Sequence, residues 1–196
     1  MYIEWRSYKM SSSYVYEKRI EIPGDCQVTL DAKTVTISGA KGTLQREFPE
    51  PQTTLRIDGN ELVATTNINR KRARALVGTA IAHVRNMLIG VQHGYTYEMK
   101  IVFSHFPMSV EVQGDELLIK NFIGERGVRR ARLIGDVEVK TTEDDVIISG
   151  IDIEAVSQSA ANIQLATKIR GKDRRVFLDG IYVIRKRKGE EVKSIV

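Results

Sequence analysis

The sequence predicts an α+β protein of two tandem homologous domains, each an antiparallel sheet packed by one helix. Three observations predict this fold. Short runs of alternating apolar and polar residues occupy most of each half of the 196-residue chain, as in half-buried strands. Each half also holds one longer stretch with apolar residues at three- and four-residue spacings, which is typical of an amphipathic helix. Equivalent segments lie about 82 to 84 residues apart, which indicates an internal duplication.

The first half begins with strands. Three alternating runs separated by short turns lie at residues 27–31, 34–38 and 43–48. Two further runs, at 55–57 and 61–65, flank Asp58-Gly59-Asn60, and an Asp-Gly pair between apolar runs is a strong hairpin signal. These segments predict antiparallel strands joined by tight turns.

The period then changes to that of a helix. One apolar stripe is formed by Ala73, Leu76, Val77, Ala80, Ile81, Val84, Leu88 and Val91. Asn67 or Asn69 is expected to cap the start of this helix, and Gly90 or Gly94 to end it. Residues 90–103 are expected to form the strand that joins the two domains.

The second half repeats this plan. Runs around Val110 and Leu117 align with those around Val28 and Val35. The runs at 137–139 and 146–149 match the first hairpin, and three acidic residues between them predict its turn: Glu143, Asp144 and Asp145. The second helix is predicted from Asp152, a good N-cap residue, and from an apolar stripe of Ile153, Val156, Ala160 and Ile163.

These patterns divide the chain into four parts. The expected boundaries are an N-terminal extension at 1–14, a first α+β domain at 15–93, a second α+β domain with a basic C-terminal hairpin at 94–190, and a tail at 191–196. No apolar run approaches the roughly 18 residues of a membrane span, so no membrane partner is expected.

The positive charge of the chain is concentrated near its C-terminal end. The net charge is +5, whereas residues 164–193 alone contain ten Lys and Arg against four acids. The cations before the tail are Lys168, Arg170, Lys172, Arg174, Arg175, Arg185, Lys186, Arg187 and Lys188. Cations in this density neutralise phosphates and release counterions, which indicates a polyanionic partner.

An apolar segment interrupts these cations. Phe177-Leu178 and Ile181-Tyr182-Val183 flank Asp179-Gly180, which predicts a β-hairpin turn at this Asp-Gly pair. The cations are therefore expected on an ordered hairpin and on the loop before it. This segment has no counterpart in the first half.

Two further basic segments are candidate nucleic-acid contacts. The loop at 124–133 carries Arg126, Arg129, Arg130 and Arg132, and we expect it to form one basic face with the C-terminal segment. The first helix begins with Arg70, Lys71, Arg72 and Arg74, whose charges oppose the helix dipole and indicate a second contact. The alternative for both segments is a solvated surface.

The sequence predicts no catalytic residue, no metal site and no cofactor. His83, His93 and His105 lack metal-ligand spacing, and His105 in Ser-His-Phe-Pro is expected to be structural. Cys26, the single cysteine, is expected to be a semi-buried apolar residue. The nucleophile and phosphate-loop motifs are absent from the sequence. Four aromatic residues are expected in strand cores: Tyr95, Tyr97, Phe103 and Phe106.

Three blocks carry a resemblance to a known family. Residues 166–186 (ATKIRGKDRRVFLDGIYVIRK), 90–100 (GVQHGYTYEMK) with 104–107 (SHFP), and 123–132 (IGERGVRRAR) resemble the universal large-subunit ribosomal protein "L-six" family of archaeal and eukaryotic type. The resemblance covers roughly 15–188. Gln164-Leu165 departs from it, because the family usually has paired Gln at this point.

The resemblance implies a structural constituent of the large ribosomal subunit. It would bind rRNA through the basic face of the second domain, near the factor-binding region that contains the sarcin–ricin loop. Its partners would be large-subunit rRNA and neighbouring ribosomal proteins, without a small-molecule substrate, on cytoplasmic ribosomes. Two alternatives remain from the residues alone: an α+β enzyme acting on an anionic substrate, and a free regulatory RNA-binding protein.

Overall fold

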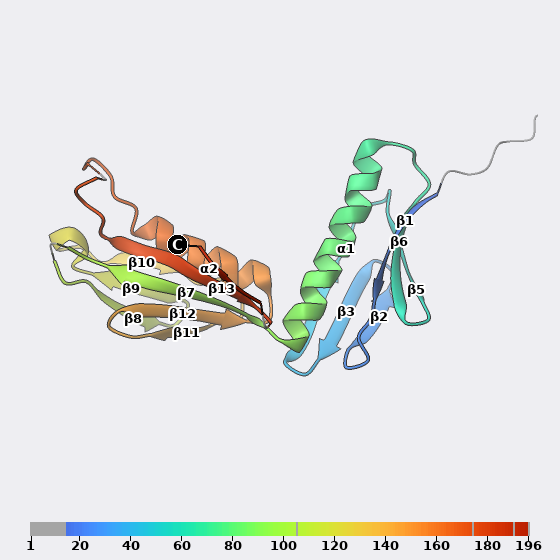
Figure 1. Cartoon of the computed structure of the whole chain (residues 1–196), viewed down its shortest axis with the longest axis horizontal. Coiled ribbons are helices and arrows are strands. Elements are labelled where there is room, and N and C mark those ends of the chain that lie inside the picture. The colour runs from blue at the N-terminus through green and yellow to red at the C-terminus, as the bar shows by residue number, and fades with distance from the viewer. Residues whose placement is uncertain (1–14, 105, 174, 190, 196) are drawn as a thin grey trace, which may run out of the picture.

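The computed structural model describes residues 15–104, 106–173, 175–189 and 191–195, which form two α+β domains (Figure 1). The expected N-terminal extension, His105 and Arg174 lie outside the described residues. The domains meet at the C-terminal end of the long first helix, so that the described chain has the shape of an open arch. This arrangement confirms the predicted fold class.

The first domain packs its helix against two antiparallel sheets, in the strand orders β1-β6-β5 and β2-β3-β4. Its elements are β1 Tyr16–Glu21, β2 Gln27–Asp31, β3 Thr34–Gly39, β4 Gly42–Glu47, β5 Thr54–Asp58, β6 Glu61–Thr66 and α1 Lys71–Gln92. The core between them includes Val35, Ile37, Leu62, Val77, Val84 and Val91. The predicted hairpin turn is present, because Asp58 pairs with Glu61 across Gly59, whose φ is +61°.

The second domain repeats this plan and extends it. Its elements are β7 Tyr95–Val102, β8 Ser109–Gln113, β9 Glu116–Lys120, the 3-10 turn η1 Phe122–Gly124, β10 Arg129–Arg132, β11 Glu138–Thr141, β12 Asp145–Gly150, α2 Ile153–Ala166, β13 Gly180–Lys188 and β14 Glu191–Ser194. The order β11-β12-β7 corresponds to β5-β6-β1, and β10-β9-β8 to β4-β3-β2. The addition is β13, which pairs along the other edge of β7 and carries β14 outside it.

Of the three helix ends predicted from the sequence, two are confirmed and one is wrong. The Asp152 side chain caps α2 by accepting a hydrogen bond of 2.9 Å from the N–H of Glu154, as predicted. The predicted end of α1 is also confirmed, because Gly94 has φ +74° and donates its N–H to the carbonyl oxygen of Gly90 at 2.9 Å. The start of α1 was predicted wrongly. Its N-cap is Arg70, which makes no side-chain capping hydrogen bond.

The predicted hairpin turn at Asp179-Gly180 is wrong. Phe177 and Leu178 form no strand, and Gly180 is the first residue of β13 with an extended backbone. Asp179 is buried, and its Oδ1 accepts a hydrogen bond of 2.9 Å from the N–H of Ser104. This contact ties the start of β13 to the end of β7. The hairpin that does form joins β13 to β14 at Gly189, whose φ is +62°.

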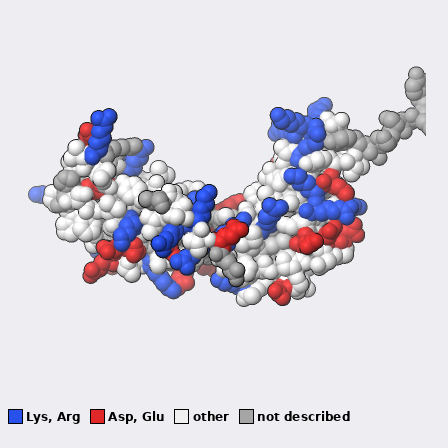
Figure 2. Space-filling view, viewed as in Figure 1, with Lys and Arg blue, Asp and Glu red and all other residues white. Residues whose placement is uncertain are grey.

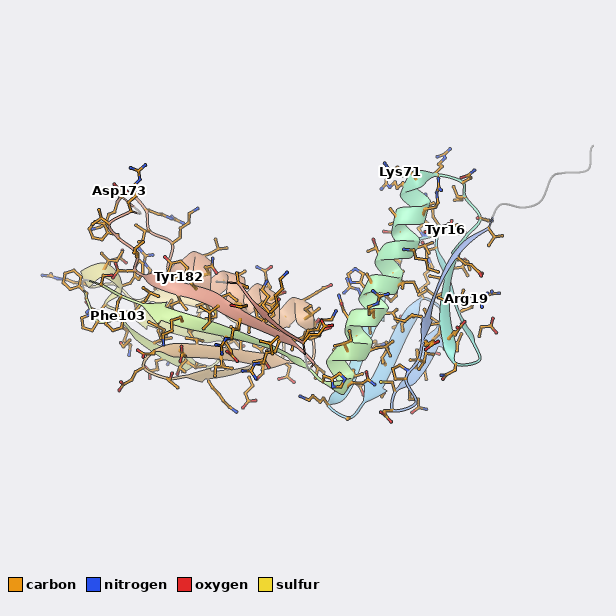
Figure 3. All side chains as sticks on the ribbon, in the orientation of Figure 1. Tyr16, Arg19, Lys71, Phe103, Asp173 and Tyr182 are labelled. Carbon is orange, nitrogen blue, oxygen red and sulfur yellow. The ribbon has the colours of Figure 1, made fainter. Side chains whose placement is uncertain are left out.

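Two smaller expectations also need correction. The arginines from Arg129 to Arg132 form the strand β10 and do not belong to a loop. Tyr95 and Tyr97 lie in the core as predicted, whereas the side chains of Phe103 and Phe106 are exposed. Phe103 follows the last residue of β7, and Figure 3 places it near the outer end of the second domain.

The domain junction is tightly packed. Gly90, near the end of α1, lies so close to the segment before α2 that a Cβ at this position would overlap the carbonyl oxygen of Ile151. Beside it, Nη1 of Arg46 on β4 donates to Oε1 of Glu154 on α2 at 2.5 Å. His83 of α1 approaches the same carboxylate at 3.4 Å. At the junction, β4 and α1 of the first domain therefore contact the start of α2 in the second domain.

Candidate nucleic-acid interface

The connection between α2 and β13, residues 167–179, is named here the C-terminal loop. Four of its cations, Lys168, Arg170, Lys172 and Arg175, are exposed, and none of them forms an ion pair with a described carboxylate. The fifth predicted cation, Arg174, lies outside the described residues. With Arg126 of the neighbouring turn, these four residues are named the tip cluster. Figure 2 shows cations gathered at this end of the second domain.

The C-terminal loop is held at both ends. The buried hydroxyl of Thr167 accepts a hydrogen bond of 3.0 Å from the N–H of Ile181, and Asp179 binds Ser104. In the middle, Oδ1 of Asp173 accepts from the N–H of Arg175 at 2.9 Å. Figure 3 places Asp173 at the outer bend of the loop. The cations thus stand on an ordered backbone, which lowers the entropy lost on binding.

Arg129 supports the tip cluster and is not part of it. Its Nε and Nη2 donate to Glu125 at 2.8 and 2.6 Å, and its Nη1 donates to the carbonyl oxygen of Ala166 at 2.8 Å. Its guanidinium also lies 4.2 Å from the centre of the Phe122 ring. These bonds lower the pKa of Glu125 below its ordinary value, first through the hydrogen bond from Arg129. Arg129 therefore fixes the end of α2, and its donors are already occupied.

The other three arginines of this region point to solvent. Arg126 is exposed, and it follows Glu125, whose carboxylate also feels the charge of Lys172. The hydrogen bonds of Arg129 to Glu125 and to the carbonyl oxygens of Ala166 and Lys168 place the Arg126 turn beside the C-terminal loop. Arg130 and Arg132 lie on the outer side of β10, because Ala131 between them is buried. Arg130 approaches Glu116 at 3.5 Å, a loose exposed pair that stabilises little.

The cations from Arg185 to Lys188, named the strand cluster, lie elsewhere. They occupy the end of β13 that pairs with Tyr95 to Glu98, near the domain junction. The tip cluster lies beyond the opposite end of this strand, which is about 25 Å long. Arg185 and Arg187 share Glu98, at 3.6 and 2.6 Å. The structure therefore separates the expected single basic face into two clusters.

The strand cluster is divided between the two faces of its sheet, because successive side chains of a strand point to opposite faces. The register of β13 against β7 shifts between Val183 and Arg185. After the shift, Arg185 and Arg187 lie on the Glu98 face, whereas Nζ of Lys186 lies 5.0 Å from the centre of the buried Tyr97 ring. Glu98 therefore neutralises part of the positive charge of this cluster, and the remaining cations are split between the two faces of the sheet.

The remaining predicted cations form the α1 cluster: Arg70, Lys71, Arg72 and Arg74. All four are exposed, and none pairs with a carboxylate of the described residues. The first turn of α1 contains no acidic residue. Figures 2 and 3 show this cluster, marked by Lys71, at the outer end of the first domain, on the same side of the arch as the tip cluster in this view.

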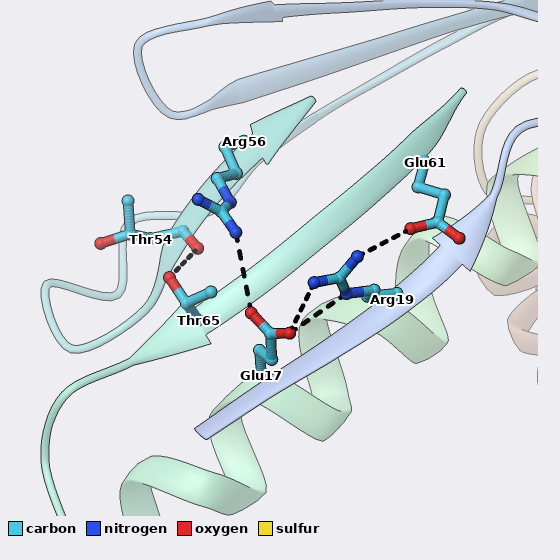
Figure 4. Close-up of polar contacts among 6 residues, drawn as sticks. All are labelled: Glu17, Arg19, Thr54, Arg56, Glu61 and Thr65. Carbon is cyan, nitrogen blue, oxygen red and sulfur yellow. Dashed lines mark hydrogen bonds and ion pairs between the residues drawn. The ribbon is translucent and has the colours of Figure 1, made fainter. Parts of the chain in front are cut away.

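On the outer face of the β1-β6-β5 sheet, the exposed cations are paired with carboxylates. Arg19 lies between Glu17 and Glu61 at 2.8 and 3.3 Å, and Arg56 approaches Glu17 at 3.7 Å (Figure 4). The hydrogen bonds that Arg19 donates to Glu17 are the main cause of the raised pKa of Arg19. These exposed charges compensate one another within the protein. This face therefore lacks the uncompensated charge of the tip and α1 clusters.

The sequence did not single out the two buried polar anchors of the loop. Thr167 looked like an ordinary residue after a helix, and Asp179 looked like a turn residue. Only their long-range partners, Ile181 and Ser104, give them their roles.

Among the described residues, no group of three or more His, Cys, Asp or Glu side chains is placed to hold a metal ion. Neither described helix is long and apolar enough to cross a membrane.

Comparison with known proteins identifies the family. The family model described as "Ribosomal protein L6" matches residues 22–94 and 106–180, one match in each domain. "Large ribosomal subunit protein uL6" of Aeropyrum pernix is 47% identical over 167 residues, which cover 85% of this chain and 92% of the relative. The proteins of that name from Methanocella arvoryzae and Sulfurisphaera tokodaii are 44% and 42% identical, over 86% and 90% of this chain and 96% and 95% of their own lengths.

The two matches of the family model follow the internal duplication, and the similarity to each relative extends through most of both domains. The chain therefore belongs to the ribosomal protein L6 family.

Proposed function

We propose that this protein is a structural constituent of the large ribosomal subunit whose tip cluster holds the phosphate backbone of folded rRNA. Membership of a family of structural ribosomal proteins supports a non-enzymatic role. The observation that supports RNA binding by the tip cluster is the ordered backbone of the C-terminal loop. Its exposed cations lack carboxylate partners among the described residues, although acids such as Glu125 and Asp173 lie nearby.

Phosphate is the ligand that these side chains fit. Arg170, Arg175 and Arg126 each carry a planar fork of donors that can bind two phosphate oxygens, and lysines add point charges. Because the backbone of the loop is fixed at Thr167 and Asp179, the cations can recognise the shape of a folded RNA without reading its bases. We place the bound RNA near the factor-binding region with the sarcin–ricin loop, as the family resemblance implies.

The α1 cluster supports a second, weaker RNA contact in the first domain. Four exposed cations at an uncapped helix N-terminus attract anions together with the free N–H groups of the first turn. The strand cluster is the third contact in this proposal, with Glu98 limiting its net charge. Neighbouring ribosomal proteins are the other partners, on cytoplasmic ribosomes.

Sedimentation of a cell extract tests this function against the free regulatory RNA-binding alternative. The tagged protein should sediment almost entirely with large subunits and 80S- or 70S-type ribosomes. A variant with Lys168, Arg170, Lys172 and Arg175 changed to Ala should shift towards the top of the gradient. Unaltered protein that sediments mainly at the top would overturn the proposal. Crosslinks from the tip cluster to rRNA remote from the sarcin–ricin region would overturn only the proposed location.

A further inference from the structure

A groove lies beside the tip cluster, between the end of α2, the C-terminal loop and the start of β13. Its volume is about 350 Å³, at the small end of the range for small-molecule sites. The walls include Leu165, Lys168, Phe177, Leu178 and Tyr182. This space is too small for a strand or helix of a partner, but it admits one planar group.

Three large side chains that line the groove are exposed to solvent although they are mainly apolar. The exposed fractions of Leu165, Leu178 and Tyr182 are 60%, 55% and 39%. Single exposed apolar residues are common, but three that line one concave surface mark a binding site. Among the described residues that line this groove there is no carboxylate, and Lys168 contributes to its wall.

The aromatic ring at one wall is held in place. The ring of Tyr182 lies over Gly180, where an added Cβ would come within 2.7 Å of its outer atoms. Its hydroxyl donates to the carbonyl oxygen of Leu178 at 3.2 Å. Phe177, which also lines the groove, is half-buried, and Nζ of Lys172 lies 4.6 Å from the centre of its ring. The groove therefore has a pre-positioned ring next to cations of the tip cluster.

We propose that this groove takes one unpaired nucleobase of the rRNA, while the tip cluster holds the phosphates on either side of it. An extruded base has a flat apolar face for Tyr182 and carries the phosphates that Lys168, Lys172 and Arg175 require. An apolar side chain of a protein would fill the groove but would leave these cations unexplained. The inference rests on the proposed rRNA-binding function and goes further by assigning a base to this site.

Ultraviolet crosslinking in intact large subunits is the first test. Irradiation joins nucleobases to aromatic side chains that they contact directly. We expect a mononucleotide adduct on the peptide that contains Phe177 or Tyr182. Adducts confined to other peptides of this protein would overturn the base site, because the groove would then lie away from any base.

The salt dependence of RNA affinity is the second test, with the full chain and a transcript of its large-subunit rRNA as the probe. Tyr182→Leu removes the flat ring and should weaken binding about fivefold to a hundredfold at every salt concentration, without a change of log–log slope. Tyr182→Phe keeps the ring but loses the hydroxyl bond to Leu178, so it should weaken binding less than Tyr182→Leu does. Leu178→Ser should weaken binding, whereas Ile57→Ser, an equally simple change of an exposed apolar residue in the first domain, should not.

The outcomes separate this inference from the proposed function. If the unaltered protein fails to bind the transcript and fails to join ribosomes, the proposed function is wrong. If binding is intact and depends on the tip cluster, but the Tyr182→Leu and Leu178→Ser proteins bind normally, only the base site is wrong. A photoreactive residue in place of Leu165 that captures a ribosomal protein and no RNA in intact subunits would also overturn it.

Discussion

Arginines of similar appearance in the sequence have opposite roles in the folded protein. Arg129 uses its guanidinium within the protein, where it joins Glu125, the carbonyl oxygen of Ala166 and the Phe122 ring. Arg175 has its backbone N–H fixed by Asp173, whereas its side chain is exposed. The first residue shapes the surface, and the second is part of the surface that RNA meets.

Arg129→Ala should therefore lower stability rather than remove a phosphate contact. The change leaves Glu125 without its partner and frees the end of α2, which should lower the free energy of unfolding by about 1.5–3 kcal/mol. Urea denaturation measures this loss. The log–log slope of RNA affinity against salt should stay constant in conditions where the variant is folded. A smaller slope with unchanged stability would show that Arg129 binds phosphate instead.

Arg175→Ala should have the reverse effect. The free energy of unfolding should change by less than about 0.5 kcal/mol, because the side chain is exposed. The slope of log affinity against log salt should fall by roughly one unit for the lost phosphate contact. Lys140→Ala is the matched control, since it removes one exposed cation from β11 near Glu138. Equal slopes for both variants would show that only total charge matters.

At the level of elements, sequence patterns succeed where all the information is local. The stripe and cap of α2 lie within one segment, so both were predictable, and the same holds for the Asp58-Gly59 hairpin. The Asp179-Gly180 signal failed because Ser104, 75 residues away, binds the aspartate, and Gly180 begins β13 beside β7. The role of Arg129 was hidden for the same reason, since Ala166 and Lys168 are distant in sequence.

The same locality limits the prediction of the candidate site. The density of cations after α2 was visible in the sequence, because charge composition needs no partner. Their division into tip and strand clusters follows from the pairing of β13 with β7, which depends on long-range contacts. The groove beside Tyr182 forms from three separate segments and could not be read from any one of them.

The junction of α1 with the second domain gives a prediction for a single element. Gly90→Ala places a methyl group against the backbone oxygen of Ile151, which cannot rotate away, and should lower the free energy of unfolding by about 1–3 kcal/mol. Gly78→Ala is the control in the same helix, because its nearest neighbour there is Nζ of Lys18 at 3.7 Å. That change should stabilise the protein by up to about 1 kcal/mol through helix propensity. Comparable stabilisation by both changes would contradict the close junction.

On the scale of the whole molecule, the duplication provides one scaffold with two different surfaces. Both domains use the same strand orders and one helix, yet only the second adds β13 and the C-terminal loop. The tip and α1 clusters lie at the two ends of the arch, and the packed junction at Gly90 and Glu154 fixes their separation (Figure 1). A rigid spacing lets two modest contacts act together on one folded RNA, because the second contact forms at a high effective concentration.

The α1 cluster offers the sharpest test of this two-ended arrangement. Cations at a helix N-terminus oppose the helix dipole, so changing Arg72 and Arg74 to Ala should raise the stability of the protein by a few tenths of a kcal/mol each. The same double variant should bind large-subunit rRNA more weakly, with a log–log salt slope that is smaller by roughly one unit per lost phosphate contact. Thermal unfolding and filter binding on one preparation measure both quantities. Greater stability together with weaker binding is the signature of residues placed for a ligand at the expense of the fold. If binding is unchanged while stability rises, the α1 cluster is a solvated helix end, and the second domain holds the RNA alone.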